Sequence, residues 1–304
     1  MRRSRASTER SRTAQIVAAF AAVYVIWGST YLAIRIGVRS EPPALFAGLR
    51  FLLAGVLMLA YAFWRGGTLP ASARDWRSIA ITGLLMLGGG NGLVTWAEQW
   101  IESNQAALMV ASSALWLAGM GALGSRGEKV NALTVAGLLL GFGGVAVLVN
   151  IGVVHRLGPP MAYAALLAAP LCWSLGSVWA RRAPVGCTPA VTSALQMLMA
   201  GAFLCGVGLA TGEAARWRGE TQALWVLLYL SVFGSCVAYG AYFWLVHQVP
   251  PARLGTYAYV NPAVAVLLGW WFLDEHLNRS QVAGTLIILA GVVLVTWASR
   301  VRKT

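Results

Sequence analysis

The sequence has few charged residues, and acidic ones are the scarcest. Only 11% of the 304 residues are charged, with 23 Lys and Arg against 10 Asp and Glu. A soluble domain usually has about 25% charged residues. This chain therefore has too little polar surface to cover itself in water, which excludes an ordinary soluble globular protein.

Residues that form metal centres and disulfides are also scarce. The chain has three histidines at predicted helix ends or in loops, and four cysteines without paired or metal-ligand spacing: His155, His247, His276, Cys172, Cys187, Cys205 and Cys236. Such cysteines usually pack as small apolar residues. No phosphate-cradling loop of the Walker type occurs, so ATP is not the direct energy source. We therefore expect no metal, no cofactor and no catalytic residues.

Long apolar runs are abundant. The chain is 58% hydrophobic with a mean hydropathy of +0.67. A run of about 20 residues crosses roughly 30 Å of hydrocarbon, and such a segment must be helical to satisfy its own backbone. The glycines at 88, 89, 90 and 92 fit this class because small residues let membrane helices approach closely. The sequence predicts an all-α membrane protein with ten transmembrane helices, at about 15–36, 44–64, 77–97, 104–124, 131–150, 160–180, 189–210, 223–246, 253–273 and 279–298.

The positive charges gather on one side of these helices. With the N-terminus in the cytoplasm, 16 Lys and Arg lie on the cytoplasmic side and five on the other: Arg39, Arg156, Arg216, Arg218 and Arg279. This bias is the positive-inside rule. It predicts that both termini, the basic tails 1–14 and 299–304, are cytoplasmic. The net charge of +13 therefore indicates topology and contact with lipid rather than nucleic-acid binding.

The two halves of the chain resemble each other. "YVIWGSTYLAIRIG" (24–37) aligns with "PLCWSLGSVWARRA" (170–183), which places Trp27 over Trp173. "GEKVNALTVAGLLLGFGGV" (127–145) aligns with "DEHLNRSQVAGTLIILAGV" (274–292), which matches Glu128 with Glu275 and Asn131 with Asn278. The repeats are 15–150 and 160–298, with five helices each. Because five is odd, the second repeat enters the membrane inverted, and such repeats usually enclose a substrate site.

Several of these motifs resemble those of a known family. "IWGSTYLAIRIG", "PPALFAGLRFLLAG" and "YAYVNPAVAVLLGWWFLDE" (257–275) are similar to the drug/metabolite transporter superfamily, specifically its EamA-type ten-helix exporters. The resemblance runs from about residue 15 to 298. It implies export of small metabolites, amino acids among them, or amphipathic compounds through a central cavity. One departure is the fourth helix, which lacks the proline expected opposite Pro262, so its bend is in question.

Polar side chains form stripes on six predicted helices. Gly88, Asn91, Thr95 and Glu98 share one face of the third. Hydrogen bonding between helices explains many single hydroxyls in membranes, but paired stripes favour a wet cavity, with Asn91 and Asn261 as the best ligands. We expect this cavity to bind substrate through Trp27, Tyr31, Asn91, Thr95, Trp116, Trp173, Ser177, Ser235, Tyr239, Tyr257 and Asn261.

Charges within the membrane predict a gate. Arg50 is the deepest charge, about 9 Å below the outer interface, and Glu98 is the carboxylate nearest in depth, with Arg35 as a rival partner. An intramembrane charge usually has a partner, although both side chains reaching the headgroups separately is the alternative. We expect Arg50, Glu98 and Arg35 to serve in gating or coupling.

These observations favour a secondary transporter in the bacterial cytoplasmic (inner) membrane. The runner-up is a nucleotide-sugar or other organic-anion carrier, disfavoured because a diphosphate requires more than one buried cation. A membrane-embedded enzyme would need a positioned nucleophile, acid–base pair or metal cluster, and a scaffold would not need paired stripes. The expected partners are a small-molecule substrate and the lipid bilayer, and the sequence leaves both a monomer and a homodimer open.

Overall fold

The computed structural model describes residues 2–121, 131–150, 158–249, 254–255, 257–275 and 279–301. The predictions that concern Glu128, His155, Arg156, His276, Asn278 and the end of the C-terminal tail lie outside these ranges. The described part of the chain is helical and contains no β-strand. The all-α prediction is confirmed.

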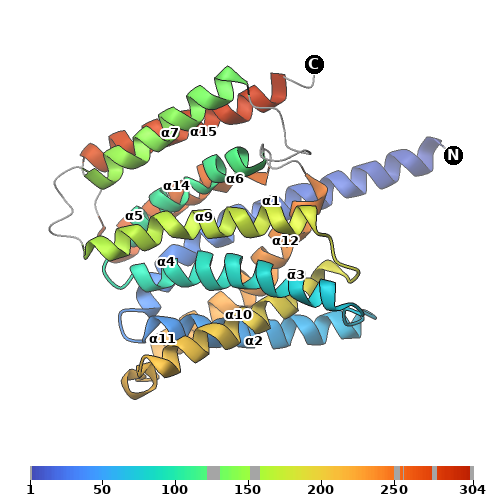
Figure 1. Ribbon diagram of the computed structural model, residues 1–304, viewed down its shortest axis with the longest axis horizontal. Helices are drawn as coiled ribbons and strands as arrows, with labels where there is room; N and C mark the ends of the chain where they lie inside the picture. Colours follow the sequence, from blue (N-terminus) through green and yellow to red (C-terminus); the bar gives the residue numbers. More distant parts are fainter. Residues whose placement is uncertain are drawn as a thin grey trace.

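The helices follow the predicted apolar runs within a few residues, except that the first begins at Arg2 and continues through the basic N-terminal segment. Figure 1 shows them lying roughly side by side, with the start of α1 projecting from one end of the bundle. They are α1 (Arg2–Gly37), α2 (Pro43–Trp64), α3 (Ala73–Gly83), α4 (Gly92–Ala97), α5 (Ser103–Val110), α6 (Ser113–Gly121), α7 (Ala132–Asn150), α9 (Pro160–Arg182), α10 (Pro189–Ala210), α11 (Thr221–Tyr229), α12 (Gly240–Gln248), α14 (Tyr257–Leu273) and α15 (Arg279–Val301).

Proline and hydroxyl residues set several helix starts. α2, α9 and α10 each begin with a proline, whose fixed φ suits the first helical position and whose missing N–H is not needed there. Thr188 and Ser72 precede α10 and α3, and each side chain accepts a hydrogen bond from a backbone N–H three residues later. The starts of these four helices are therefore set by their local sequence.

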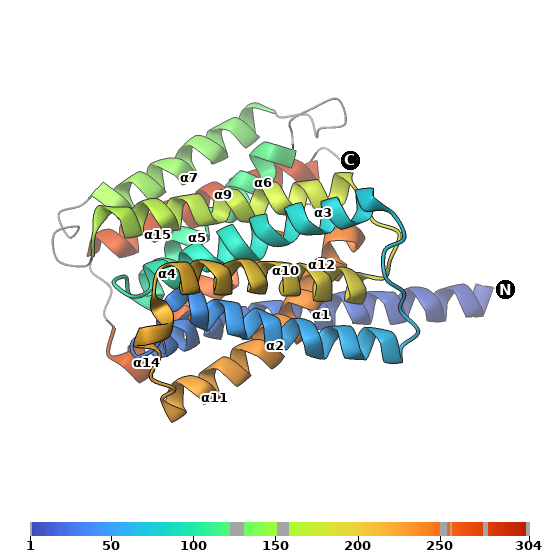
Figure 2. The ribbon, with the colours of Figure 1, turned by 60° about the horizontal axis from the view of Figure 1, so that its bottom comes forward.

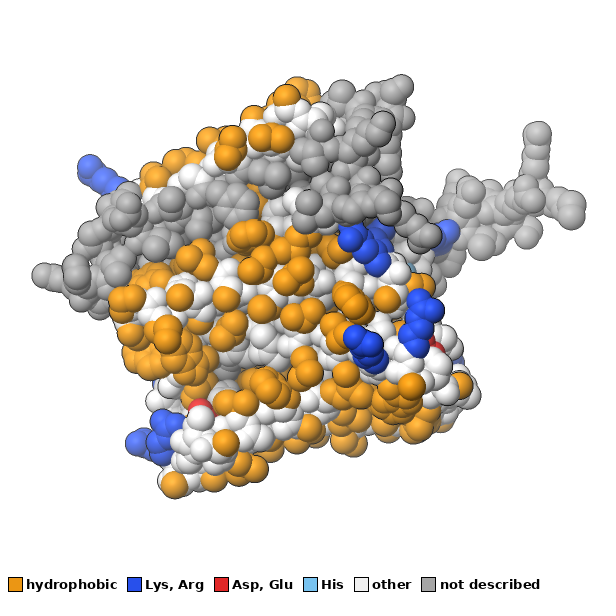
Figure 3. Space-filling model, viewed as in Figure 1, with side chains coloured by type: hydrophobic (Ala, Val, Ile, Leu, Met, Phe, Trp, Pro, Cys, Tyr) orange, Lys and Arg blue, Asp and Glu red, His pale blue; other side chains and the backbone are white. Residues whose placement is uncertain are grey.

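Six helices in the described ranges are long and apolar enough to cross a membrane. They are Arg12–Gly37, Pro43–Trp64, Ala73–Ala97, Pro160–Arg182, Pro189–Ala210 and Thr221–Gln248. Apolar side chains cover the middle of the face in Figure 3, while Lys and Arg gather toward its two ends. Large residues such as Trp64, Trp225 and Trp271 are strongly exposed. An apolar belt between basic ends is the surface of a multi-pass membrane protein.

The third and eighth predicted spans share an unusual feature. Between α3 and α4 the chain forms a π-helical segment, η1 (Leu84–Asn91), and between α11 and α12 it forms a second, η3 (Leu230–Tyr239). Their first residues are 146 positions apart, the same offset that relates Trp27 to Trp173. π-Helical turns are rare and occur frequently at functional sites.

The fourth predicted span is interrupted although it lacks a proline. α5 ends at Val110 and α6 begins at Ser113. The Ser112 N–H and hydroxyl both bond to the Met109 carbonyl, which tightens the chain into a turn. The ninth span, α14, remains one helix with Pro262 inside it. The helix is therefore interrupted at Ala111 and Ser112, close to the position where the resemblance implied a proline.

Glycines bring two pairs of helices into close contact. α2 packs along α10, where a Cβ on Gly201 would lie 2.8 Å from the Leu52 backbone nitrogen. α7 packs along α15, where a Cβ on Gly291 would lie 2.5 Å from the Gly141 nitrogen and 2.6 Å from the Gly137 oxygen. The Gly137–Gly141 pair is therefore an internal packing seam. In Figures 1 and 2 the α7–α15 pair lies on the opposite side of the bundle from α2 and α11.

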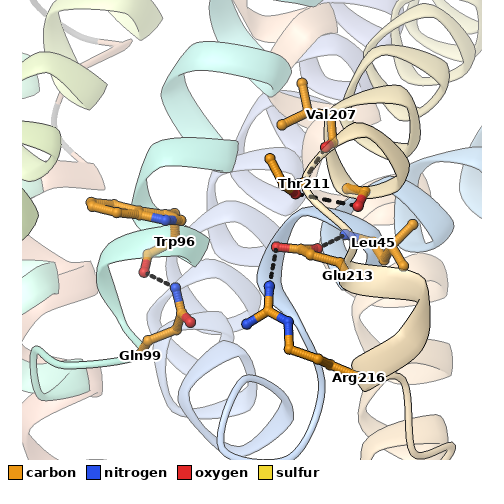
Figure 4. Close-up of polar contacts among 8 residues, drawn as sticks. Leu45, Trp96, Gln99, Val207, Thr211, Glu213 and Arg216 are labelled. Carbon is orange, nitrogen blue, oxygen red and sulfur yellow. Dashed lines mark hydrogen bonds and ion pairs between the residues drawn. The ribbon is translucent and has the colours of Figure 1, made fainter.

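Three buried glutamates fasten one end of the bundle, where α1 ends and α2 begins. Glu213 accepts a hydrogen bond from the Leu45 N–H in the first turn of α2, at 2.8 Å (Figure 4). Glu41 accepts from the Arg218 and Glu220 N–H groups just before α11, and Glu275 accepts from the Ser103 and Asn104 N–H groups at the start of α5. Carboxylates suit helix N-termini because the backbone N–H groups there lack partners. Each of these cap glutamates (Glu41, Glu213 and Glu275) connects residues before 150 to residues after 160.

Candidate functional site

A cavity lies inside the bundle between the two halves of the chain. Helices α1, α2, α4 and α5 with η1 line it from the first half, and α9, α14 and η3 from the second. The space open to the centre of a water molecule is about 60 Å³, and one water needs about 10–15 Å³ on the same measure. The cavity therefore has room for several waters or a small solute.

Arg50 is the charged residue of the cavity wall. Its side chain is 3% exposed, with Nε 3.0 Å from Ser235 Oγ and Nη1 3.3 Å from Asn91 Oδ1. Ser231 donates to the Arg50 carbonyl at 3.1 Å, which holds α2 against η3. A Cβ on Gly234 would lie 3.0 Å from Nη2, so glycine leaves the space that the guanidinium uses. Both π-helical segments thus meet at Arg50, through Asn91 and through Ser235.

Aromatic rings form another part of the wall. Trp27 and Trp173 meet edge to face with their ring centres 5.3 Å apart. Tyr257 lies 5.7 Å from Trp27, and Tyr239 lies 6.0 Å from Trp173. Edge-to-face contacts of this kind add about 0.5–1.5 kcal/mol beyond area burial. The wall is therefore apolar but can also contact a cation or a flat ring.

Hydrogen bonds fix the orientation of these rings. The Trp27 indole N–H donates to the Gly234 carbonyl at 3.1 Å, and the Trp173 indole N–H donates to the Tyr242 hydroxyl at 3.0 Å. Tyr257 and Ser113 hydroxyls are 3.0 Å apart. The π-helical segment η3 therefore positions two wall residues: Trp27 through the Gly234 carbonyl and Arg50 through the Ser235 hydroxyl.

The structure brings most of the predicted substrate-binding residues to the cavity. Eight line it: Trp27, Tyr31, Asn91, Trp173, Ser235, Tyr239, Tyr257 and Asn261. Thr95, Trp116 and Ser177 are not among the lining residues. Thr95 donates to the Asn91 carbonyl at 2.9 Å, and Ser177 lies 2.9 Å from the Tyr242 hydroxyl. Thr95 and Ser177 therefore support wall residues instead of forming the wall.

The two predicted asparagine ligands have different surroundings. The Asn91 amide oxygen accepts from Arg50. Asn261, with its amide oriented to satisfy its neighbours, donates to the Tyr24 and Tyr257 carbonyls at 3.2 Å each. Asn91 therefore belongs to the charged part of the wall, whereas Asn261 connects α1 to α14.

Glu98 and Arg35 lie outside the cavity lining. Arg35 donates to the Glu98 backbone carbonyl, while the Glu98 carboxylate is fully buried and neither oxygen accepts a hydrogen bond from the described residues. Among the described residues, the pairs of opposite charge within 4.0 Å are Arg216–Glu213 and Arg218–Glu220. In this conformation Arg50 bonds neutral acceptors, and its predicted pairing with Glu98 stays a prediction.

Sequence reasoning missed Gln196 on α10. This residue is fully buried; its Nε2 donates to the Thr82 hydroxyl at 2.6 Å, and its Oε1 accepts from the Tyr239 hydroxyl at 2.7 Å. The available signal was an amide within the span that follows Thr192 and Ser193 at helical spacing, because lipid offers no hydrogen bonds. Gln196 positions Tyr239 at the cavity.

Known proteins resemble this chain in both sequence and fold. The model of the EamA-like transporter family matches the chain twice, over residues 14–150 and 160–297.

The chain belongs to the EamA-like transporter family.

It is 40% identical to the uncharacterized inner membrane transporter YedA of Escherichia coli K12, over 90% of this chain and 88% of that one. It is 25% identical to a protein of Salmonella typhimurium named as a probable amino-acid metabolite efflux pump, over 93% and 95% of the two chains. A solved crystal structure shares the fold, with a TM-score of 0.68 and 21% identity over 94% of this EamA-like chain and 99% of that one. The family match and the named relatives indicate a multi-pass membrane transport protein.

Proposed function

We propose that this EamA-like protein is a secondary transporter that exports small metabolites, amino acids or amphipathic compounds by alternating access. Ten transmembrane helices form two inverted five-helix repeats around the cavity, with both termini in the cytoplasm. The observation that carries the proposal is a polar and aromatic cavity whose wall comes from both halves of a duplicated chain. A site at a repeat interface is what rocking halves can expose to either side in turn.

Two symmetric features support the inverted repeat. The π-helical segments η1 and η3 begin at positions related by the repeat offset, and the repeat-related Trp27 and Trp173 touch each other. Residues related by a two-fold axis touch only when they lie close to that axis. The proposed two-fold axis between the repeats therefore passes close to the cavity wall.

Within the cavity, the rings of Trp27, Tyr31, Trp173, Tyr239 and Tyr257 pack against the apolar part of a substrate. Asn91, Ser235 and Asn261 supply polar contacts to it. Thr95 and Ser177 hold these groups in place, and Trp116 remains a proposed contact in another conformation. The partners are the substrate and the bilayer, with no nucleic acid, and either a monomer or a homodimer is compatible with this site.

Arg50, Glu98 and Arg35 form the proposed gate and coupling group. The buried Glu98 carboxylate accepts no hydrogen bond from the described residues in this conformation. It can pair with one of the two arginines when the halves move, because a buried charge favours any conformation that pairs it. If the pair forms during the cycle, reversing it as Arg50→Glu with Glu98→Arg should restore part of the transport that either single change loses. A double variant no better than the poorer single one would leave the gate pair unsupported.

The alternative of a nucleotide-sugar carrier is tested by a transport assay in liposomes. Purified protein in liposomes is screened against amino acids, dyes and nucleotide sugars, with and without a pH gradient. Export of at least one small solute above empty liposomes is expected, and nucleotide sugars should not compete. The absence of flux for every solute would contradict a transport function.

A further inference from the structure

We propose that Arg50 binds the carboxylate of a singly charged organic anion, and that the aromatic wall holds the apolar body of the same molecule. This inference rests on the proposed function and specifies the chemical class of substrate for the same cavity. Its basis is the incomplete bonding of a buried guanidinium at the cavity wall.

The guanidinium has unused donors. Arginine carries five N–H groups, and the bonds from Nε to Ser235 and from Nη1 to Asn91 use two of them. Nη2 makes no hydrogen bond within the described part of the chain. The bonded pair fixes the plane of the side chain and leaves the Nη edge available. That edge can bind a carboxylate with two parallel hydrogen bonds, whereas the other bidentate edge includes Nε, which Ser235 already occupies.

The charge of the wall also points to an anion. Arg50 is the charged residue among the described residues that line the cavity, and both of its partners are neutral. Burying an ion without a counter-charge is costly, and the Glu98 carboxylate is farther than 4.0 Å from the guanidinium. An anion that enters the cavity supplies the missing contact. A single cation suits one negative charge, which favours a monocarboxylate over a diphosphate.

The remaining wall defines the rest of the molecule. The rings of Trp27, Trp173, Tyr239 and Tyr257 suit a flat or apolar body. No carboxylate of the described residues lines the cavity to pair with an ammonium group. The geometry therefore favours an aromatic or branched acid and does not require a free amino group.

Benzoate and benzamide provide a matched pair of probes, nearly identical in shape and different in charge. Calorimetry on the purified full-length protein should show benzoate binding at least about tenfold more tightly than benzamide, since only benzoate carries the charge that forms charge-assisted hydrogen bonds with the guanidinium. Arg50→Gln should remove that preference, and Ser235→Ala, which removes one positioning contact, should reduce it. Arg65→Gln removes a charge from an exposed arginine outside the cavity, and this control should leave the preference for benzoate over benzamide unchanged.

Three results would overturn the proposal. They are equal binding of benzoate and benzamide, an unchanged preference in folded Arg50→Gln protein, and tighter binding of inorganic sulfate than of benzoate, which would indicate a site for tetrahedral anions. If Arg50→Gln does not fold, the Ser235→Ala variant and the probe pair decide the question. Labelled benzoate flux in liposomes separates the two claims: binding without flux of any solute contradicts transport alone, whereas flux of solutes without charge preference contradicts the carboxylate site alone.

Discussion

Asn91 and Asn104 are two membrane-embedded amides with opposite roles. Asn91 accepts from Arg50 at the cavity wall, whereas Asn104 is fully buried in α5 and neither its amide oxygen nor its nitrogen has a partner among the described residues. An unpaired buried amide costs about 1–3 kcal/mol. The same residue type therefore serves binding at one position and reduces stability at the other.

Replacing each asparagine by leucine should separate these roles. Asn91→Leu is expected to reduce transport in liposomes at least about tenfold with little change in melting temperature, because Arg50 loses a charge-assisted bond. Asn104→Leu should raise the melting temperature and keep transport. Wild-type transport in Asn91→Leu would show that its amide only supports helix packing.

Some residues of the candidate site were predictable from the sequence, and others were not. The polar stripes that contain Asn91, Ser235 and Tyr257, on three different spans, were predictable because lipid excludes unpaired polar groups. The hydrogen bonds of Arg50 were not predictable, because the depth of a residue along a helix does not tell which way its side chain points around the helix axis. The π-helical segment η1 also changes the direction in which its partner Asn91 points. Gln196 was missed although Thr192 and Ser193 precede it at i−4 and i−3, because α10 was not among the helices whose polar faces were assigned to the cavity.

At the level of elements, the glycines of the third span have distinct neighbours. A Cβ on Gly83 would lie 2.8 Å from the Gln196 carbonyl oxygen and 2.9 Å from its Cα, whereas a Cβ on Gly88 would meet Phe203 at 3.4 Å. Backbone atoms cannot move aside as a side chain can. Gly83 therefore allows α10 to approach, while Gly88 has room for a methyl group.

Alanine at these two positions makes a matched test. Gly83→Ala should lower the melting temperature of the purified protein, because α3 and α10 must separate. Gly88→Ala should be neutral or stabilising by up to about 1 kcal/mol, from the higher helix propensity of alanine. Equal melting temperatures for both variants would mean that the α3–α10 contact is loose.

The helix boundaries were predictable from apolar runs and prolines, but the π-helical segments and the break at Ser112 were not. In a π-helix each backbone hydrogen bond joins residues five apart, and in an α-helix residues four apart. Composition does not encode that difference. The break coincides with the backbone and hydroxyl bonds from Ser112 to the Met109 carbonyl. Both features involve local backbone bonds that hydropathy does not detect.

For the whole molecule, the inverted-repeat model makes a topological prediction. A reporter fused after residue 304 should report the cytoplasm, and one inserted near Gly219, in the connection between α10 and α11, should report the outer side. The physical reason is the surplus of Lys and Arg on the cytoplasmic side. Both reporters on the same side would contradict two inverted five-helix repeats.

The cap glutamates make a second prediction at this scale. Glu275→Gln replaces the charged acceptor at the start of α5 by a neutral one, which weakens the closed end of the bundle. In a background without the four native cysteines, Ser235→Cys should then react faster with a membrane-impermeant thiol reagent added from outside. Glu220→Gln, at a half-exposed side chain on the same end, is the control. Equal labelling in both variants would show that this cap does not restrain opening.

The same three glutamates bear on how the proposed exporter rests between transport events. In the proposed orientation they all lie on the face toward the environment, and each joins one half of the chain to the other. Contacts of this kind stabilise a conformation that is closed on their side, so in the proposed exporter the empty cavity is reached more often from the cytoplasm than from outside. Such a bias slows the re-entry of a compound that has already left the cell, while the driving force alone sets its final distribution across the membrane.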